Sequence, residues 1–312
     1  MIVSCGESLV DFVPVEGGEL AYRPCPGGSP FNLAVAAARL GAPTGFLGKI
    51  SRDFFGDMLF DKLAGEGVDT SMVVRTDRNT TLAFVLLEAG SEPRYAFYAE
   101  NSADRSFTGV DVPVSLPRDA SALAFGSISL LLEPGASAIK ALVRREAGKR
   151  ALSFDPNVRP MLVGDAAAYV AGVEELAALS TMTKVSSADL EWLYPGRNAE
   201  ESAARWLSLG AGLVAMTRGA DGAILLGPSW RAEVPGYPVD VLDTIGAGDT
   251  FHAALLTRLH ALGRLGPDLA VRLTADEGRD ALAWAVKASA LNCARRGADP
   301  PTTAEMDAAP AV

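Results

Sequence analysis

One short stretch of the sequence could bind an anion and carry a base at the same place. Residues 243–251 read Asp-Thr-Ile-Gly-Ala-Gly-Asp-Thr-Phe, so Gly246, Ala247 and Gly248 stand directly before Asp249, and an apolar helical pattern follows. Small residues let the backbone approach a ligand, and the amides at the start of a helix attract anions. Two interpretations stay open here: a tight turn in which Asp249 caps the helix, or a phosphate cradle in which Asp249 acts on a substrate.

The spacing in this stretch excludes two common phosphate-binding loops. A Walker A loop ends in Gly-Lys-Ser/Thr, and a dinucleotide fingerprint has a third glycine where Phe251 stands. The first predicted strand is followed by "GESLVD", which also lacks the fingerprint. A dinucleotide-dependent oxidoreductase is therefore not favoured.

Four further loops have side chains or open backbone suited to a sugar or a nucleotide. In "DPNVRP", Arg159 follows a predicted strand and offers five donors to sugar or phosphate oxygens. Each loop alone is as typical of an ordinary turn or helix start as of a binding site. The loops therefore indicate a binding site only if the fold brings them together. The candidate residues in these loops are Asp11, Gly27, Gly28, Asn32, Asp155, Asn157, Arg159, Thr217, Gly219 and Gly222.

The elements that must position these loops alternate along the chain. Apolar runs predict strands at 1–6, 44–51, 122–128, 150–157, 181–186, 213–219 and 222–228. Helical spacing predicts helices at 29–42, 53–68, 135–148, 166–180, 188–193, 201–210, 249–263 and 278–297. In the first helix Ser29 is the expected N-cap, Pro30 the first helical position and Gly41 the stop.

Such alternation predicts an α/β fold with a parallel sheet that helices cover on both faces. Ligands of these sheets bind beyond the carboxyl ends of the strands, which is where the candidate loops fall. Between about residues 72 and 107 the pattern changes, because "TTLAFVLLEAGSEPRYAFYAE" predicts a β-hairpin with "GSEP" at its turn and no helical partner. This segment is a candidate for a β flap outside the α/β body.

Composition narrows the class of protein further. The 312 residues are 49% hydrophobic and 21% charged, which is typical of a packed globular chain, and the net charge of −10 disfavours nucleic acid as a partner. Three scattered cysteines and two histidines supply no disulfide framework, zinc site or histidine-based triad. The N-terminus has no signal-peptide pattern and no stretch suits a membrane span, so a soluble cytoplasmic protein without a membrane partner is expected.

Together these segments resemble the ribokinase-like carbohydrate kinase family of the phosphofructokinase-B (PfkB) type. "PGGSPFNLAVAAARLG" and "GKISRDFFGDML" are similar to its N-terminal signature, and "DTIGAGDTFHAALL" is similar to its specific C-terminal signature. "TRGADGA" and "NCARRGA" follow in the family's order, so the resemblance covers almost the whole chain. It implies a ribokinase-like parallel-sheet α/β sandwich, a single kinase domain over 1–312, and a small β-sheet lid formed by about 12–24 and 72–107. Lids of this family often pair edge to edge, which implies a homodimer.

The resemblance also implies roles for the candidate residues. Asp249 would be the general base that takes a proton from the sugar hydroxyl, and the amides of Gly246, Ala247 and Gly248 would stabilise the transferred phosphoryl group. The sugar would be held by Asp11, Gly27, Gly28, Asn32, Phe97 and Arg159. ATP would be held by Lys184, Thr217, Gly219, Gly222 and Gly248, with Mg²⁺ bound to its phosphates mostly through water.

Two departures from the family pattern concern ions. The family often has Asn-x-x-Glu near the magnesium; here residues 186–189 read Ser-Ser-Ala-Asp, so the shorter carboxylate of Asp189 would act through water. Asp243 and the Ile245 carbonyl match a monovalent-cation site, but Pro301 stands where a serine is common. Dependence on potassium therefore stays open.

Within the family, "GESLVDFVP", "FDPNVRPML" and "KVSSADLEWL" resemble bacterial fructokinases most closely, which predicts ATP-dependent phosphorylation of fructose to fructose 6-phosphate. A 2-keto-3-deoxygluconate kinase is the alternative, since it shares Arg159. Those kinases have an arginine after two lid tyrosines, where this chain has Ala99, although Arg94 or Arg105 could compensate. Ribokinase fits the "DPNVRP" loop less well. A non-catalytic sensor would be expected to lose the base or the anion hole, and both are kept.

Overall fold

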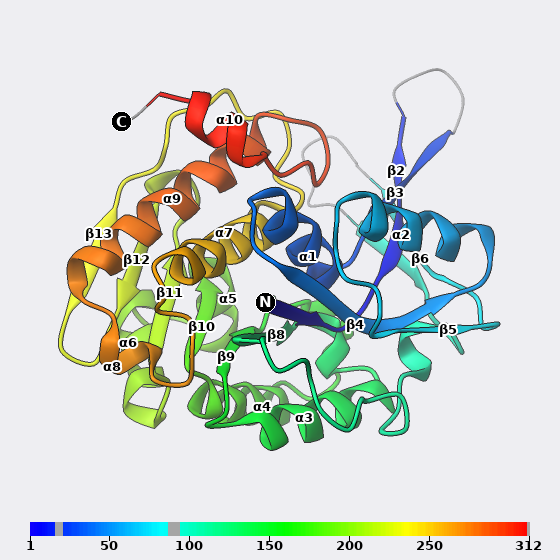
Figure 1. The fold of residues 1–312 in the computed structure, drawn as a ribbon, viewed down its shortest axis with the longest axis horizontal. Coiled ribbons are helices and arrows are strands. Elements are labelled where there is room, and N and C mark those ends of the chain that lie inside the picture. Colours follow the sequence, from blue (N-terminus) through cyan, green and yellow to red (C-terminus); the bar gives the residue numbers. More distant parts are fainter. Residues whose placement is uncertain (16–20, 87–93, 311–312) are drawn as a thin grey trace.

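Buried apolar strands form a nine-stranded sheet through the middle of the molecule (Figure 1). The structure is a computed structural model that describes residues 1–15, 21–86 and 94–310. The strand order is β13-β12-β11-β10-β9-β8-β1-β4-β5. The strands are β1 (Ile2–Cys5), β4 (Thr44–Ser51), β5 (Val73–Thr76), β8 (Ala122–Gly126), β9 (Ala151–Asp155), β10 (Met182–Ser186), β11 (Leu213–Thr217), β12 (Ala223–Leu226) and β13 (Arg231–Val234).

The sheet is mixed, because one edge departs from the expected parallel arrangement. Neighbouring strands from β5 to β11 are parallel, whereas β12 is antiparallel to both β11 and β13. The chain turns between β11 and β12 within a few residues, and the Arg218 N–H donates to the Gly222 carbonyl at 2.8 Å. A turn this short can join only antiparallel neighbours, since a parallel pair needs a long crossover.

Helices cover both faces of the sheet, as the alternation along the chain predicts (Figure 1). One face carries α1 (Ser29–Arg39), α2 (Phe54–Gly65), α7 (Ala247–Ala261) and α9 (Ala275–Cys293); the other carries α3 (Gly135–Glu146), α4 (Ala166–Leu179), α5 (Ser187–Leu193) and α6 (Ala199–Leu209). Successive strand residues serve opposite faces: Ile2 packs into the α1–α7–α9 core and Val3 into the α3–α4–α6 core. The short helices α8 (Leu269–Arg272) and α10 (Thr303–Ala308) precede and follow α9 along the chain.

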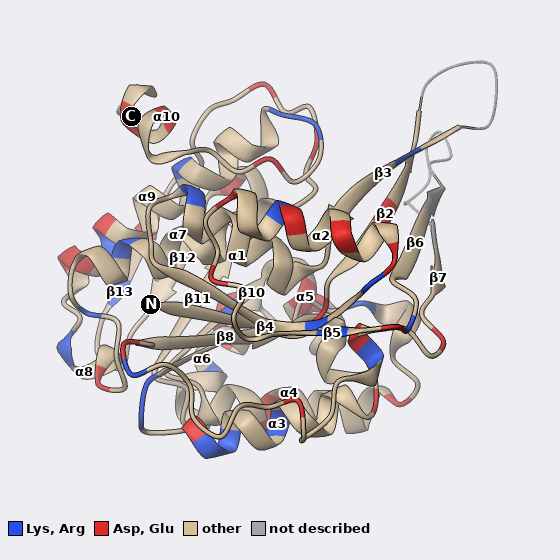
Figure 2. Cartoon of the chain, turned by 45° about the vertical axis from the view of Figure 1, so that its right-hand side comes forward, with Lys and Arg blue, Asp and Glu red and all other residues tan. Residues whose placement is uncertain are grey.

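Charged residues fall mainly in helices and loops (Figure 2), and the five central strands β1, β8, β9, β10 and β11 contain only Asp155 and Lys184. Asp155 is the last residue of β9 and Lys184 lies within β10, and both residues are buried. Buried charges are costly unless they are paired, so their position marks a place to look for function. Within the described part of the chain, no helix has the length and apolarity that a membrane crossing needs.

A second, smaller sheet stands beside one end of the large one. Its order is β3 (Tyr22–Gly27), β2 (Leu9–Pro14), β6 (Thr81–Leu86) and β7 (Arg94–Tyr98). The predicted hairpin is present as the antiparallel β6–β7 pair, and its predicted "GSEP" turn lies outside the described residues. Within the segment 72–107, strands β6 and β7 belong to the smaller sheet, whereas β5 pairs with β4 of the large sheet.

The register of the smaller sheet decides which side chains face inward. Asp11 of β2 lies opposite Ala83 of β6, which lies opposite Phe97 of β7, so these side chains share one face. Phe12 and Phe84 lie on the other face, where their rings stack with centroids 4.5 Å apart. The inward face therefore presents a carboxylate and an aromatic ring to the large sheet.

Candidate active site

A cleft with a volume of about 800 Å³ lies between the smaller sheet and the carboxyl ends of the parallel strands. Its lining comes from β2, β7, the start of α1, the turn before α7, and the loops that follow β9, β10 and β11. The size is in the range of small-molecule sites. The predicted site residues that line it are Asp11, Gly28, Asn32, Phe97, Asn157, Arg159, Lys184, Asp189, Thr217, Gly219, Ile245, Gly246, Gly248 and Asp249.

Asp249 is held from the side by α1 and does not cap its own helix. The N-cap position of α7 is Gly246, and no side chain caps this helix. The Ser29 hydroxyl donates to Asp249 Oδ1 at 2.6 Å, and the Asn32 amide donates to Oδ2 at 2.9 Å. The prediction of Ser29 as an N-cap is wrong, because Gly28 takes that position with φ +102° and leaves the hydroxyl free to bond Asp249.

Burial makes Asp249 a stronger base than an ordinary aspartate. Only 8% of the residue is exposed, and the loss of solvation raises the pKa of its carboxyl group. The hydrogen bonds from Ser29 and Asn32 and the charge of Lys184 oppose this rise in pKa, but burial dominates. A carboxylate in this environment accepts a proton more readily while two donors keep it oriented.

The backbone in front of Asp249 offers hydrogen-bond donors to the cleft. Gly246 and Gly248 line the cleft, and among the described residues their N–H groups have no acceptor. The Ala247 N–H instead donates to the Thr244 carbonyl at 3.2 Å, and Ala247 does not line the cleft. The predicted anion hole therefore has two available N–H groups, with the third used in its own turn.

A buried cation stands next to these amides. Lys184 Nζ lies 2.9 Å from Asp155 Oδ2, and both side chains are about 5% exposed or less. A methyl group on Gly248 would come within 2.9 Å of the ammonium, which shows how closely Lys184 approaches this backbone. Burial lowers the pKa of Lys184, but the negative charges of Asp155 and Asp189 outweigh it and the pKa is raised, so the ammonium stays charged.

Three predicted residues have structural explanations that the sequence did not suggest. Asp189 accepts hydrogen bonds from the Ser186 N–H and hydroxyl and from the Val158 N–H, so its carboxylate closes a capping box at the start of α5. Gly222 lies outside the cleft lining, and a side chain there would meet the Val234 carbonyl at 2.1 Å. Gly27 also lies outside the lining, directly against Asp11.

The cleft has groups that could bind the phosphates of ATP, but it has no cluster of side-chain ligands for Mg²⁺ among the described residues. The cleft supplies donors and glycine backbone for phosphates, which suits ATP. Among the described residues, no three histidine, cysteine, aspartate or glutamate side chains gather as metal ligands, and Asp189 is already bonded to three donors. This arrangement fits Mg²⁺ only as an ion carried by phosphate and water.

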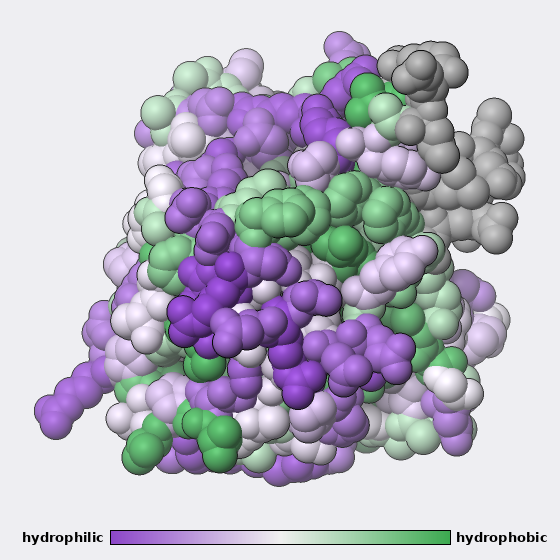
Figure 3. Space-filling view, turned by 90° about the vertical axis from the view of Figure 1, so that its right-hand side faces the viewer, coloured by the Kyte–Doolittle hydropathy of each residue, from purple (hydrophilic) through white to green (hydrophobic). Residues whose placement is uncertain are grey.

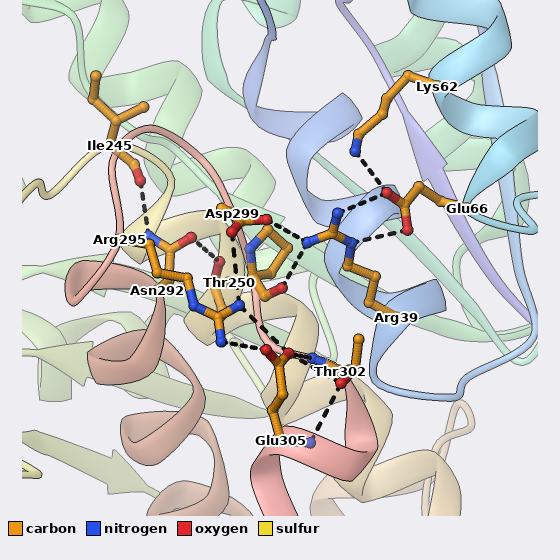
Figure 4. Close-up of polar contacts among 11 residues, drawn as sticks. Arg39, Lys62, Glu66, Ile245, Thr250, Asn292, Arg295, Asp299, Thr302 and Glu305 are labelled. Atoms are coloured by element: carbon orange, nitrogen blue, oxygen red, sulfur yellow. Dashed lines mark hydrogen bonds and ion pairs between the residues drawn. The ribbon is translucent and has the colours of Figure 1, made fainter.

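The groups expected for a monovalent cation are hydrogen-bonded to protein donors. Asp243 accepts hydrogen bonds from the Ile245 N–H at 3.0 Å and from the Gly297 N–H at 2.7 Å. The Ile245 carbonyl accepts from the Asn292 side-chain amide at 2.8 Å (Figure 4). Each of these oxygens keeps a lone pair, because a carbonyl can accept two hydrogen bonds and a carboxylate about four, so a cation site here stays a prediction.

Comparison with known proteins places this geometry in a family. The model described as "pfkB family carbohydrate kinase" matches residues 1–305. The chain belongs to this family. The expected ribokinase-like α/β fold and the expected class, an ATP-dependent carbohydrate kinase, are thereby confirmed.

This chain is similar over most of its length both to relatives of known function and to proteins of known structure. A fructokinase of Rhizobium leguminosarum bv. trifolii is 42% identical over 261 residues, which are 83% of this chain and 79% of the relative. The structure of a Vibrio cholerae O395 fructokinase in its fructose-, ADP- and calcium-bound form is 30% identical, with a TM-score of 0.86 and coverage of 98% and 97%. An aminoimidazole riboside kinase of Salmonella enterica is 27% identical, with a TM-score of 0.85 and coverage of 98% of both chains.

Two residues that the sequence did not indicate lie around Asp249. Ser29 bonds Asp249 directly, and its spacing of three from Asn32 on a helix is the signal that could have indicated a shared partner. Glu7 is buried and accepts from the Ser29 N–H at 3.3 Å and from the Ser129 hydroxyl. Burial raises the pKa of Glu7 to about 7. No pattern around Glu7 in the sequence indicates these contacts.

Gly27→Ala is expected to weaken sugar binding without loss of the fold. The added methyl would lie 2.2 Å from Asp11 Oδ2, so the carboxylate must rotate away. Losing one hydrogen bond to a charged group should raise the KM for the sugar about tenfold or more and leave the KM for ATP unchanged. Gly65→Ala is the matched control, because nothing lies within 4 Å of that position. An unchanged sugar KM in Gly27→Ala would exclude this role for Asp11.

The KM for the sugar is expected to rise in acid because of Asp11. Burial raises the pKa of Asp11 to about 6; the charge of Arg159 opposes this rise and the charge of Asp249 adds to it. Below that pH the group gains a proton and loses acceptor capacity for sugar hydroxyls, so the KM for the sugar should increase as pH falls through about 6. Steady-state kinetics of wild type and Asp11→Asn would check this, and identical pH profiles would contradict it.

Proposed function

We propose that this protein transfers the γ-phosphoryl group of ATP to fructose, giving fructose 6-phosphate and ADP. The observation that carries the proposal is the placement of Asp249, which two α1 donors orient beside the free amides of Gly246 and Gly248. Relatives 37–42% identical to this chain are fructokinases, which supports fructose as the acceptor.

In the proposed reaction, Asp249 accepts the proton of the sugar hydroxyl while the oxygen attacks the γ-phosphorus and the bond to ADP breaks. A positioned base contributes about 10²–10⁴-fold to the rate. Negative charge on the transferred group is stabilised by the N–H groups of Gly246 and Gly248 and by the ammonium of Lys184. Magnesium bound to ATP would neutralise phosphate charge, and its ligands would be phosphate and water.

The sugar is proposed to bind at the end of the cleft nearest the smaller sheet. Asp11 and Phe97 face this end from neighbouring strands, and Arg159 lines it from the loop after β9. One Arg159 nitrogen donates to Asn157 Oδ1 at 2.7 Å, which leaves the other guanidinium donors for sugar hydroxyls. Closure of the smaller sheet as a lid over the sugar would exclude water from the reaction.

ATP is proposed to bind at the other end, along the loops after β10 and β11. Thr217 and Gly219 line the cleft there, and Gly219 has φ +57°, a left-handed conformation that exposes its backbone. Because ATP is an intracellular substrate, the proposal includes a cytoplasmic location.

The acceptor is tested by a coupled ADP-release assay over fructose, ribose, mannose, 2-keto-3-deoxygluconate and nucleosides. We expect fructose to give the highest kcat/KM, with ATP and Mg²⁺ required. A higher kcat/KM for 2-keto-3-deoxygluconate would replace fructose by a sugar acid. Turnover with none of these acceptors would overturn the proposed function.

We also propose that two copies of the chain form a homodimer through the smaller sheet. Viewed from the end of the molecule that carries this sheet, apolar side chains form a band across the surface (Figure 3). Phe54 and Tyr98 are 74% and 65% exposed, which is unusual for large aromatic residues unless a partner covers them. We expect wild type to sediment as a dimer and Tyr98→Asp to shift toward monomer; a monomeric wild type would contradict this part.

A further inference from the structure

The loop after β9 carries an arginine that is oriented by oxygens of its own loop. Arg159 lines the cleft and is exposed. Its Nη1 donates to Asn157 Oδ1 at 2.7 Å, to the Val158 carbonyl at 3.1 Å and to the Asn157 carbonyl at 3.3 Å. Among the described residues, its Nε and Nη2 hydrogens have no acceptor. The protein therefore holds one end of the guanidinium and leaves the other end available to a ligand.

Asn157 combines an unusual backbone conformation with a side chain that can accept a hydrogen bond. Its φ is +41°, in the left-handed region that asparagine and aspartate tolerate better than most residues. Its N–H donates to Asp155 Oδ1 at 3.1 Å, two residues earlier, which closes a tight turn. Glycine would adopt the same backbone conformation without supplying the acceptor for Arg159.

Two carboxylates hold the backbone of this loop against the rest of the site. Asp155 is 3% exposed, and its second oxygen, Oδ2, lies 2.9 Å from Lys184 Nζ. Asp189 of α5 accepts from the Val158 N–H at 3.0 Å. The loop is therefore held on both sides of its turn, and the freedom that remains lies in the long side chain of Arg159.

The position of Arg159 also affects Asp11 of the smaller sheet. Burial raises the pKa of Asp11 to about 6; the charge of Arg159 opposes this rise and the charge of Asp249 adds to it. A guanidinium that moved away would lower the pKa of Asp11 less, because the interaction between two charges weakens with distance. The pKa of Asp11 therefore reports the position of Arg159 and needs no turnover.

We propose that Asn157 is a positioning residue for the sugar: its carboxamide orients the Arg159 guanidinium in the free protein, so that less conformational entropy is lost when the sugar binds. The proposal rests on the proposed function, in which Arg159 donates to sugar hydroxyls. Ordering a side chain with many rotamers costs affinity when it happens on binding. Asn157 thus acts through Arg159 on sugar binding rather than on the transfer of the phosphoryl group.

The first test compares Asn157→Gly with Asn157→Asp. Glycine keeps the left-handed backbone and removes the acceptor, whereas aspartate keeps both. We expect the KM for the sugar to rise about two- to tenfold in Asn157→Gly, the loss typical of one side chain that must be ordered on binding, with a much smaller change in kcat. Asn157→Asp should retain most of the affinity. An unchanged sugar KM in Asn157→Gly, or an equal rise in both variants, would overturn the proposal.

Asn101→Gly is the matched control for this comparison. Asn101 also has a positive φ, of +55°, but it is exposed in the turn after β7 and does not line the cleft. It should therefore leave the KM for the sugar unchanged, and thermal unfolding should show that both glycine variants fold. A rise in KM equal to that of Asn157→Gly would overturn the proposal, because the added backbone freedom would then explain both results.

The second test measures the pKa of Asp11 by NMR titration of its carboxyl carbon, without sugar or ATP. Arg159 and Asp249 are the charged groups that act on Asp11, and neither is replaced in Asn157→Gly. Arg159→Gln supplies the pKa without the cation. We expect the pKa in Asn157→Gly to lie between those of wild type and Arg159→Gln; the wild-type value would overturn the proposal. If no tested acceptor is phosphorylated, the proposed function fails, and this titration still decides whether Asn157 positions Arg159.

Discussion

Asp249→Asn is expected to keep the fold and ATP binding and to lose about 10²–10⁴-fold in kcat. Asparagine has nearly the same shape, and its oxygen can still accept from Ser29 or Asn32, but it cannot take a proton from the sugar. The coupled ADP assay measures kcat, calorimetric titration measures ATP binding, and thermal unfolding measures the fold.

The pH profile adds a second readout to the same variant. Burial raises the pKa of Asp249, so wild-type kcat should fall as pH decreases through that raised value, at a higher pH than for an ordinary aspartate. The residual activity of Asp249→Asn should lack this acid limb. Asp165→Asn is the control, because Asp165 caps α4 remote from the cleft and asparagine caps a helix equally well. Near-normal turnover in Asp249→Asn would remove Asp249 from the mechanism.

Lys184→Met is expected to damage both stability and catalysis. It leaves Asp155 buried without its 2.9 Å partner, and breaking a buried pair in this way costs about 3–5 kcal/mol of unfolding free energy. It also removes the charge beside Gly248, and the loss of one transition-state donor lowers kcat about 10²–10³-fold. Urea unfolding and the coupled assay measure the two effects separately.

The double variant Lys184→Met with Asp155→Asn separates the two roles of Lys184. Without either charge, no unpaired ion stays buried, so much of the lost stability should return. The kcat should stay low, because the cation facing the phosphate is still missing. Recovery of kcat together with stability would show that Lys184 serves the fold alone.

The main helices and strands, and the meeting of the candidate loops at one edge of the sheet, could be predicted from the sequence. Apolar runs separated by helical spacing specify a covered sheet, and the carboxyl ends of parallel strands must meet at one edge. Asp249, Gly246, Arg159 and Thr217 were therefore predicted from their places after strands or before a helix, and all four line the cleft.

The contacts within the site could not be predicted in the same way. Ser29 has the residue type and position of an N-cap, and only the packing of α1 against α7 shows that it bonds Asp249 instead. Asp189 has the charge for a metal contact, but its carboxylate closes a capping box. The partners of Asn292 lie more than 40 residues away along the chain, so no local pattern reveals them.

Phosphorus NMR of ATP, Mg²⁺ and fructose incubated with the protein tests most directly whether this cleft transfers a phosphoryl group to fructose with Asp249 as the base. We expect the resonance of fructose 6-phosphate to grow with wild type as ATP is converted to ADP, and to be almost absent over the same time with Asp249→Asn. Equal product from both proteins, or release of inorganic phosphate that does not depend on fructose, would contradict the claim.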